Sequence, residues 1–77
     1  MTWTILAKDQ FRASYGGEVW LLVSTPSGLK PWLLYTERQV QGRPARQQEI
    51  GVREPEAARH AAEFWLRLSA SYGLTRY

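Results

Sequence analysis

The chain has 77 residues, of which 44% are hydrophobic, with four tryptophans and a formal net charge of +3. This composition is not that of a disordered segment, and it indicates one small globular domain over residues 1–77. Cysteine is absent, which excludes disulfides and cysteine-based zinc sites.

The first half of the chain predicts β-strands, because apolar, β-branched and aromatic residues occur there in short segments bounded by turn residues. The segments are residues 2–6 (TWTIL), 10–15 (QFRASY), 18–24 (EVWLLVS), 31–40 (PWLLYTERQV) and 45–52 (ARQQEIGV). Gly16 and Gly17 can supply the positive φ angles of a two-residue hairpin turn. Turns are also expected at residues 25–28 (TPSG) and 41–44 (QGRP).

The second half changes to a helical period. Pro55 suits the first helical position, and Gly73 suits the residue just past the end. The apolar stripe predicted to be buried consists of Ala58, Ala61, Trp65, Leu68 and Tyr72, flanked by Ala57 and Phe64. The expected fold class is α+β: an antiparallel sheet of three to four strands in a meander, followed by one C-terminal α-helix packed on one face.

One helix covers only one face of a sheet, yet both predicted faces carry large apolar residues. The cover for the second face is expected to be the N-terminal strand, a second copy of the chain in a homodimer, or a protein partner. Partner binding would then use an exposed aromatic face that includes Trp20, Trp32 and Tyr35.

The N-terminal residues MTWTILAKDQ lack the basic and apolar regions of a signal peptide. The longest apolar run, VWLLV, is far shorter than the ~20 residues of a membrane-spanning helix. We therefore expect a cytoplasmic protein with no membrane partner.

The sequence predicts no catalytic residues, no metal site and no cofactor. His60 is the single histidine and falls on the predicted polar side of the helix, without a second metal ligand or a nucleophile placed near it. Asp9 is the only aspartate, and no glycine-rich phosphate loop precedes a helix. We expect the protein not to be an enzyme.

The segment from Arg38 to Gln48 has three arginines and no acidic residue. A two-stranded ribbon fits the major groove of DNA, where Arg can bridge the acceptors of guanine and Gln can bridge adenine. The candidate nucleic-acid-binding residues are Arg38, Arg43, Arg46 and Gln48. The plainer interpretation is a solvated hairpin whose polar residues keep an edge strand from aggregating.

Residues 35–68 resemble the arm-type (amino-terminal) DNA-binding domain of phage integrases. The matching features are Gly42-Arg43 in a hairpin turn, Ile50-Gly51 after the strand, and EPEAARHAAEFW at the helix start. The resemblance covers roughly the second half of the chain. It implies that the sheet enters the major groove of duplex DNA, with contact roles for the same three arginines and Gln48.

The sequence therefore leaves two alternative hypotheses about function. The first is a small DNA-binding module that uses its Arg/Gln-rich hairpin. The second is a phage- or plasmid-type inhibitor or adaptor, for example a CRISPR inhibitor, that binds a host protein through the aromatic sheet face.

Overall fold

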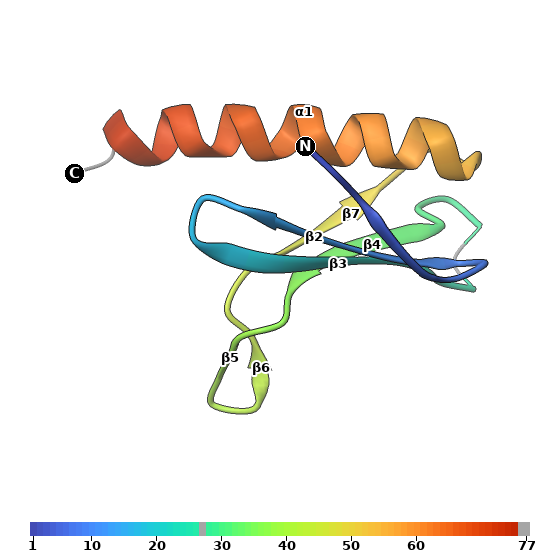
Figure 1. The fold of residues 1–77 in the computed structure, drawn as a ribbon, viewed down its shortest axis with the longest axis horizontal. Coiled ribbons are helices and arrows are strands. Elements are labelled where there is room, and N and C mark those ends of the chain that lie inside the picture. Colours follow the sequence, from blue (N-terminus) through green and yellow to red (C-terminus); the bar gives the residue numbers. More distant parts are fainter. Residues whose placement is uncertain (27, 76–77) are drawn as a thin grey trace.

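The computed structural model describes residues 1–26 and 28–75, with side chains described through Ser69. A five-stranded antiparallel sheet has the order β1-β2-β3-β4-β7, and helix α1 lies across one of its faces (Figure 1). The elements are β1 (Thr4–Ala7), β2 (Gln10–Tyr15), β3 (Glu18–Ser24), β4 (Trp32–Thr36), β5 (Gln39–Val40), β6 (Arg43–Pro44), β7 (Gln47–Ile50) and α1 (Pro55–Thr75). The predicted α+β class and the meander agree with this arrangement, although the sheet has five strands instead of three to four.

The N-terminal strand extends the sheet and does not cover its second face. β1 pairs with β2 through Thr4 opposite Arg12 and Ile5 opposite Phe11, which makes β1 an edge strand. Ile5 is 70% exposed there. Of the three expected covers, the N-terminal strand is therefore excluded, and no described element covers the face away from α1.

The β2–β3 turn forms as the sequence predicts. Tyr15 pairs with Glu18, and the two residues between them, Gly16 and Gly17, have φ angles of 61° and 80°. Positive φ at both central positions is characteristic of a type I′ turn, whose twist matches that of the two strands it joins. The turn therefore sets the β2–β3 register, which places Ala13 opposite Trp20.

The core lies between the sheet and α1. The strand register puts large side chains on the face toward the helix, and the helix contributes small ones. The buried sheet residues are Phe11, Ala13, Trp20, Leu22, Trp32, Leu34 and Ile50, and the buried helix residues are Ala58, Ala62 and Leu66. Because alanine occupies two of these helix positions, the helix can approach a sheet surface that two tryptophans make bulky.

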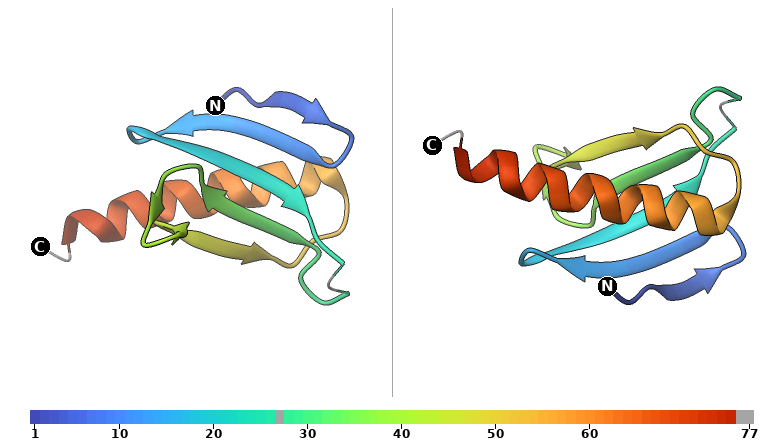
Figure 2. Two further views of the ribbon diagram at one scale, coloured as in Figure 1. Left: turned by 90° about the horizontal axis from the view of Figure 1, so that it is seen from below. Right: turned by 90° about the horizontal axis from the view of Figure 1, so that it is seen from above.

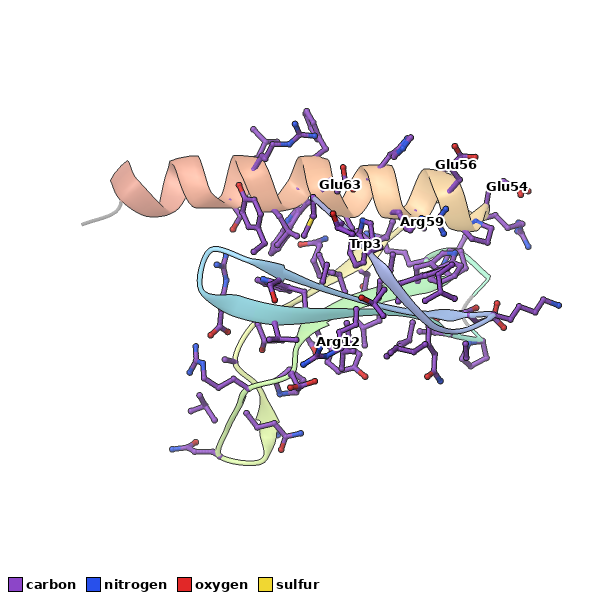
Figure 3. The ribbon with its side chains drawn as sticks, viewed as in Figure 1. Trp3, Arg12, Glu54, Glu56, Arg59 and Glu63 are labelled. Carbon is purple, nitrogen blue, oxygen red and sulfur yellow. The ribbon has the colours of Figure 1, made fainter. Side chains whose placement is uncertain are left out.

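The tryptophans of this core also satisfy their polar atoms. The indole N–H of Trp20 donates to the carbonyl of Tyr15 at 3.3 Å, and that of Trp32 donates to the carbonyl of Arg53 at 3.0 Å. Trp3 donates to Glu63 of α1 at 2.8 Å, so the N-terminus is joined to the helix (Figure 3). A buried indole N–H without a partner carries a desolvation cost, which the bonds of Trp20 and Trp32 avoid.

The buried side of α1 agrees with the predicted stripe only in part: Ala58 is buried, and Ala61 and Trp65 pack against the core while partly exposed. Ala62 and Leu66 face the sheet, whereas Leu68 is 41% exposed and Phe64 is 62% exposed. Ala61 and Trp65 are only half-buried at the side of the stripe. The helix is apolar around much of its circumference, so periodicity alone does not select the side that meets the sheet.

The ends of α1 are partly as expected. The helix starts at Pro55, and the amide of Ala58 donates to the carbonyl of Glu54 at 2.8 Å in its first turn. It continues to Thr75, so the predicted stop at Gly73 is wrong. The side chain of Tyr72, a member of the predicted buried stripe, lies outside the described residues.

Candidate nucleic-acid interface

The β5–β6 hairpin is separated from the main sheet by a β-bulge. Tyr35 pairs with Gln47 in the sheet, and the next pairs are Gln39 with Pro44 and Val40 with Arg43. The first strand therefore uses one more residue than the second between the two ladders. An extra residue of this kind bends the ribbon and increases its twist. The predicted continuous strand over 31–40 is broken at this point into β4 and β5, and the predicted strand over 45–52 is shortened to β7.

Thr36 holds the corner of the bend. Its side chain is buried, and its hydroxyl donates to the carbonyl of Arg38 at 3.0 Å. The same oxygen accepts the amide of Arg46 at 3.1 Å. The amide of Thr36 donates in turn to the carbonyl of Arg46 at 3.0 Å. One buried hydroxyl thus replaces the ladder bonds that the bulge interrupts.

The hairpin closes on a tight turn at Gln41-Gly42. Their φ angles are 55° and 80°, so both central residues are left-handed, as in a type I′ turn. Glycine adopts this conformation without a steric penalty, and Gln41 is the only non-glycine residue with positive φ among those described. The predicted four-residue turn QGRP is therefore shorter, because Arg43 and Pro44 belong to β6.

The bend directs the hairpin away from the helix. Figure 1 shows β5 and β6 projecting from the sheet on the side opposite α1. Every residue from 37 to 43 is exposed. The tip is thus a narrow two-stranded ribbon that contacts little of the main body.

Arg43 is the most available of the predicted arginines. It lies in β6 beside the turn, is exposed, and has no acidic partner among the described residues. Gln39 and Gln41 are exposed on the same hairpin. The tip therefore presents one unpaired guanidinium and two amide side chains.

Arg38 lies at the base of the hairpin and is already paired. Its Nε donates to Oε1 of Glu18 at 2.8 Å. This hydrogen bond, and then the negative charge of Glu18, raises the pKa of Arg38 above its usual value. The other oxygen of Glu18 is buried and accepts no hydrogen bond from a described residue. The pair fixes the hairpin base to β3, so Arg38 is less available for DNA than Arg43.

Arg46 is directed toward the helix and not toward the tip. Its guanidinium carbon lies 5.6 Å from the ring centre of Trp20 and 5.5 Å from that of Trp65. Its Nη2 also donates to the hydroxyl of Ser69. Cation–π contacts with two tryptophans and a hydrogen bond to α1 give Arg46 a structural role. This placement argues against the predicted DNA contact.

Gln48 lies on the face of the sheet that α1 covers. It stands opposite Leu34, is half-buried, and its amide nitrogen donates to the carbonyl of Glu49 at 3.0 Å. The structure therefore does not bring the four predicted residues together. Arg43 and Arg38 lie on the hairpin, whereas Arg46 and Gln48 pack on the helix side.

Sequence reasoning missed Arg12, which lies on the open face of the sheet (Figure 3). Its Nε contacts Glu37 at 3.2 Å, and both side chains are about half exposed. Glu37 is the only acidic residue of the hairpin, and this ion pair occupies it. The alternation of residues along β2 indicates this position, because it places Arg12 on the face of the sheet opposite to that of Phe11 and Ala13.

The predicted aromatic partner face is wrong in two of its three residues. Trp20 is 1% exposed and Trp32 is 2% exposed, and both lie under α1. Tyr35 is half-buried on the open face, together with aliphatic neighbours. Because side chains alternate along a strand, Trp20 and Trp32 face the helix while Leu21 and Leu33 face the open side.

His60 is exposed on α1, as predicted. No group of three metal-ligating side chains occurs among the described residues. Within residues 1–26 and 28–75, no helix has the length and apolar character needed to cross a membrane. No protein-family model, curated protein or solved structure matches the chain.

Proposed function

We propose that the chain is a small DNA-binding module whose β5–β6 hairpin contacts a groove of duplex DNA. The observation that carries the proposal is the projecting ribbon, exposed from residue 37 to 43, with Arg43 unpaired beside its turn. A two-stranded ribbon has the width that the major groove of B-DNA, about 12 Å wide, admits. The helix and sheet then serve as the rigid support for this ribbon.

The charges near the tip favour an anionic partner. Within the hairpin the acidic residue Glu37 is bound to Arg12, which leaves the guanidinium of Arg43 without an opposing charge. Guanidinium binds phosphate oxygens or guanine in a bidentate manner. Gln39 and Gln41 supply amides that can pair with adenine. Arg38 can bind a phosphate only if that phosphate displaces Glu18. We therefore expect Arg38 to contribute less to DNA binding than Arg43.

The test is a salt titration of binding to duplex DNA of mixed sequence, measured by fluorescence anisotropy. We expect weak binding that falls steeply with salt, because each phosphate contact contributes about −0.9 to the slope of log affinity against log salt. The Arg43→Ala variant should bind more weakly, with a slope smaller by about 0.9. The matched control is Arg53→Ala, which removes the same charge from an exposed side chain in the segment before α1.

Absence of binding by the parent at low salt would refute the proposal. So would an Arg43→Ala variant that binds with the affinity and salt slope of the Arg53→Ala control. A difference between these two variants at equal net charge locates the contact on the hairpin and excludes a general attraction between the chain and DNA.

The second candidate is protein binding through the open sheet face. The observation that favours it is the half-buried group opposite α1, made of Val19, Leu21, Val23, Leu33 and Tyr35. An apolar face of this kind commonly marks a protein contact. Tyr35→Ser should then reduce binding to a host protein while leaving DNA binding unchanged.

A further inference from the structure

The helix carries a second apolar stripe, of which only Ala61 packs in part against the core. Its members are Ala57, Ala61, Phe64 and Leu68, which follow one another at intervals of four, three and four residues. Because an α-helix turns by about 100° per residue, this spacing places all four on one side of α1. We call them the outer stripe. Ala57 is exposed and Ala61 half-buried, while Phe64 is 62% and Leu68 41% exposed.

The outer stripe differs from the stripe that packs on the sheet, which contains Ala58, Ala62 and Leu66. Viewed from the helix side, α1 lies on top of the sheet with no other element above it (Figure 2). Intervals of four and three residues are those of the contact seam between paired helices. No charged side chain interrupts the outer stripe.

We propose that a second copy of this chain covers the outer stripe, with the two α1 helices packed antiparallel about a twofold axis. The side chains of the outer stripe are ordered by size along the helix. The small residues come first and the large ones second. A twofold axis midway between Ala61 and Phe64 places Ala61 against Phe64 of the second copy. It also places Ala57 against Leu68 of the second copy.

Each large side chain then meets a small one on the opposing helix, which is the complementarity that close packing needs. A parallel pair would instead set phenylalanine against phenylalanine and alanine against alanine. The antiparallel arrangement also brings the positive end of each helix dipole near the negative end of the other. The stripe is therefore complementary to itself in one orientation.

The size of the contact predicts a weak, reversible dimer. Phe64 is 62% exposed, so it offers roughly 100–150 Å² to a partner. The stripe extends over about 16 Å of helix, so the interface falls below the ~1,200 Å² of stable complexes. Each chain has a net charge of +3, and salt should strengthen association by screening the repulsion between copies. DNA binding has the opposite salt dependence, which separates the two proposals.

The first experiment is sedimentation equilibrium of the parent over the micromolar to millimolar range. We expect a monomer–dimer equilibrium that Phe64→Ser weakens by more than about tenfold. The matched control is Val40→Ser, which removes an exposed hydrophobic side chain from the hairpin on the other side of the sheet. It should leave the association constant unchanged. Circular dichroism verifies that both variants are folded.

A size exchange tests the register. Leu68→Ala should weaken the dimer, and Ala57→Leu should weaken it by placing two leucines opposite each other. The double variant with both changes restores a large-to-small match and should recover association.

Because the chain has no cysteine, crosslinking can confirm the orientation. In a mixture of the two variants, a disulfide should form between Ala57→Cys of one chain and Leu68→Cys of the other. This mixed disulfide should form in preference to a disulfide between two chains that carry the same substitution. A parent that stays monomeric at millimolar concentration would overturn the proposal. Equal dimerisation of Phe64→Ser and Val40→Ser, or crosslinking of Ala57→Cys chains with themselves, would overturn it as well.

Discussion

Replacing Thr36 with valine removes one buried hydroxyl from the corner that holds the hairpin, while the shape of the side chain is nearly unchanged. In the parent this oxygen accepts the amide of Arg46 at 3.1 Å and donates to the carbonyl of Arg38 at 3.0 Å. The Arg38 carbonyl keeps a second partner, the amide of Ala45 at 3.0 Å. The Arg46 amide has no such replacement, so Thr36→Val leaves it without its partner.

The expected cost follows from these two bonds. The Arg46 amide is only part-buried, so the loss of its partner costs about 1 kcal/mol, the low end of the ~1–3 kcal/mol for a buried donor. A lost hydrogen bond whose acceptor keeps another partner costs about 0.5–1.5 kcal/mol, so we expect Thr36→Val to lower the free energy of unfolding by roughly 1.5–2.5 kcal/mol. For a domain of this size that is a large part of the total, and the thermal midpoint should fall by roughly 10–20 °C.

Urea and thermal unfolding followed by tryptophan fluorescence measure this difference. The control is Thr36→Ser, which keeps the hydroxyl and loses a methyl group, at a cost of about 1 kcal/mol. The stability order should be parent, then Thr36→Ser, then Thr36→Val. A Thr36→Val variant as stable as Thr36→Ser would refute the reasoning, because the hydroxyl would then contribute nothing to the bend.

Four further substitutions test the packing of the helix. Leu66→Ala should destabilise the fold by ~2–5 kcal/mol, whereas Leu68→Ala should cost far less, because only Leu66 faces the sheet. Urea unfolding of dilute protein measures both losses. Equal losses would show that the buried side of α1 is assigned wrongly. Arg46→Ala should lower the unfolding free energy by about 1 kcal/mol although Arg46 is exposed, since it contacts two tryptophan rings; an unchanged midpoint would contradict this contact. Trp3→Phe should speed amide hydrogen exchange in β1 by removing the bond to α1, and unchanged exchange there would show that the bond holds nothing in place.

The fold was largely predictable because its signals are local. Alternation located the strands, and Gly16-Gly17 marked a turn whose positive φ angles the structure confirms. Pro55 marked the helix start correctly. The strand over residues 31–40 could not be divided in advance, because the bulge depends on a buried Thr36 hydroxyl that bonds to Arg46 ten residues away.

The buried side of the helix could not be read from its period. Alanine, phenylalanine, tryptophan and leucine cover two adjacent stripes, and either one satisfies helical spacing. The choice depends on the opposing sheet surface, which the helical period does not describe. Ala58, Ala62 and Leu66 are buried against that surface and Trp65 meets Trp20 edge-on, which leaves Phe64 outside.

The candidate site was predictable as a segment and not as a set of residues. The acid-free segment from Arg38 to Gln48 does contain a projecting hairpin. Which arginine is available depends on contacts distant in sequence, namely Glu18 for Arg38 and Trp20 for Arg46. Of the three predicted arginines, only Arg43 is exposed with neither an acidic partner nor an aromatic contact among the described residues.

The most direct test of the proposed function compares Arg43→Ala with Arg53→Ala in the salt titration of duplex DNA binding. Both variants have the same net charge, and only Arg43 lies on the hairpin. The account predicts weaker binding and a slope smaller by about 0.9 for Arg43→Ala alone. Identical affinities and slopes for the two variants would contradict it and leave the hairpin as a solvated turn.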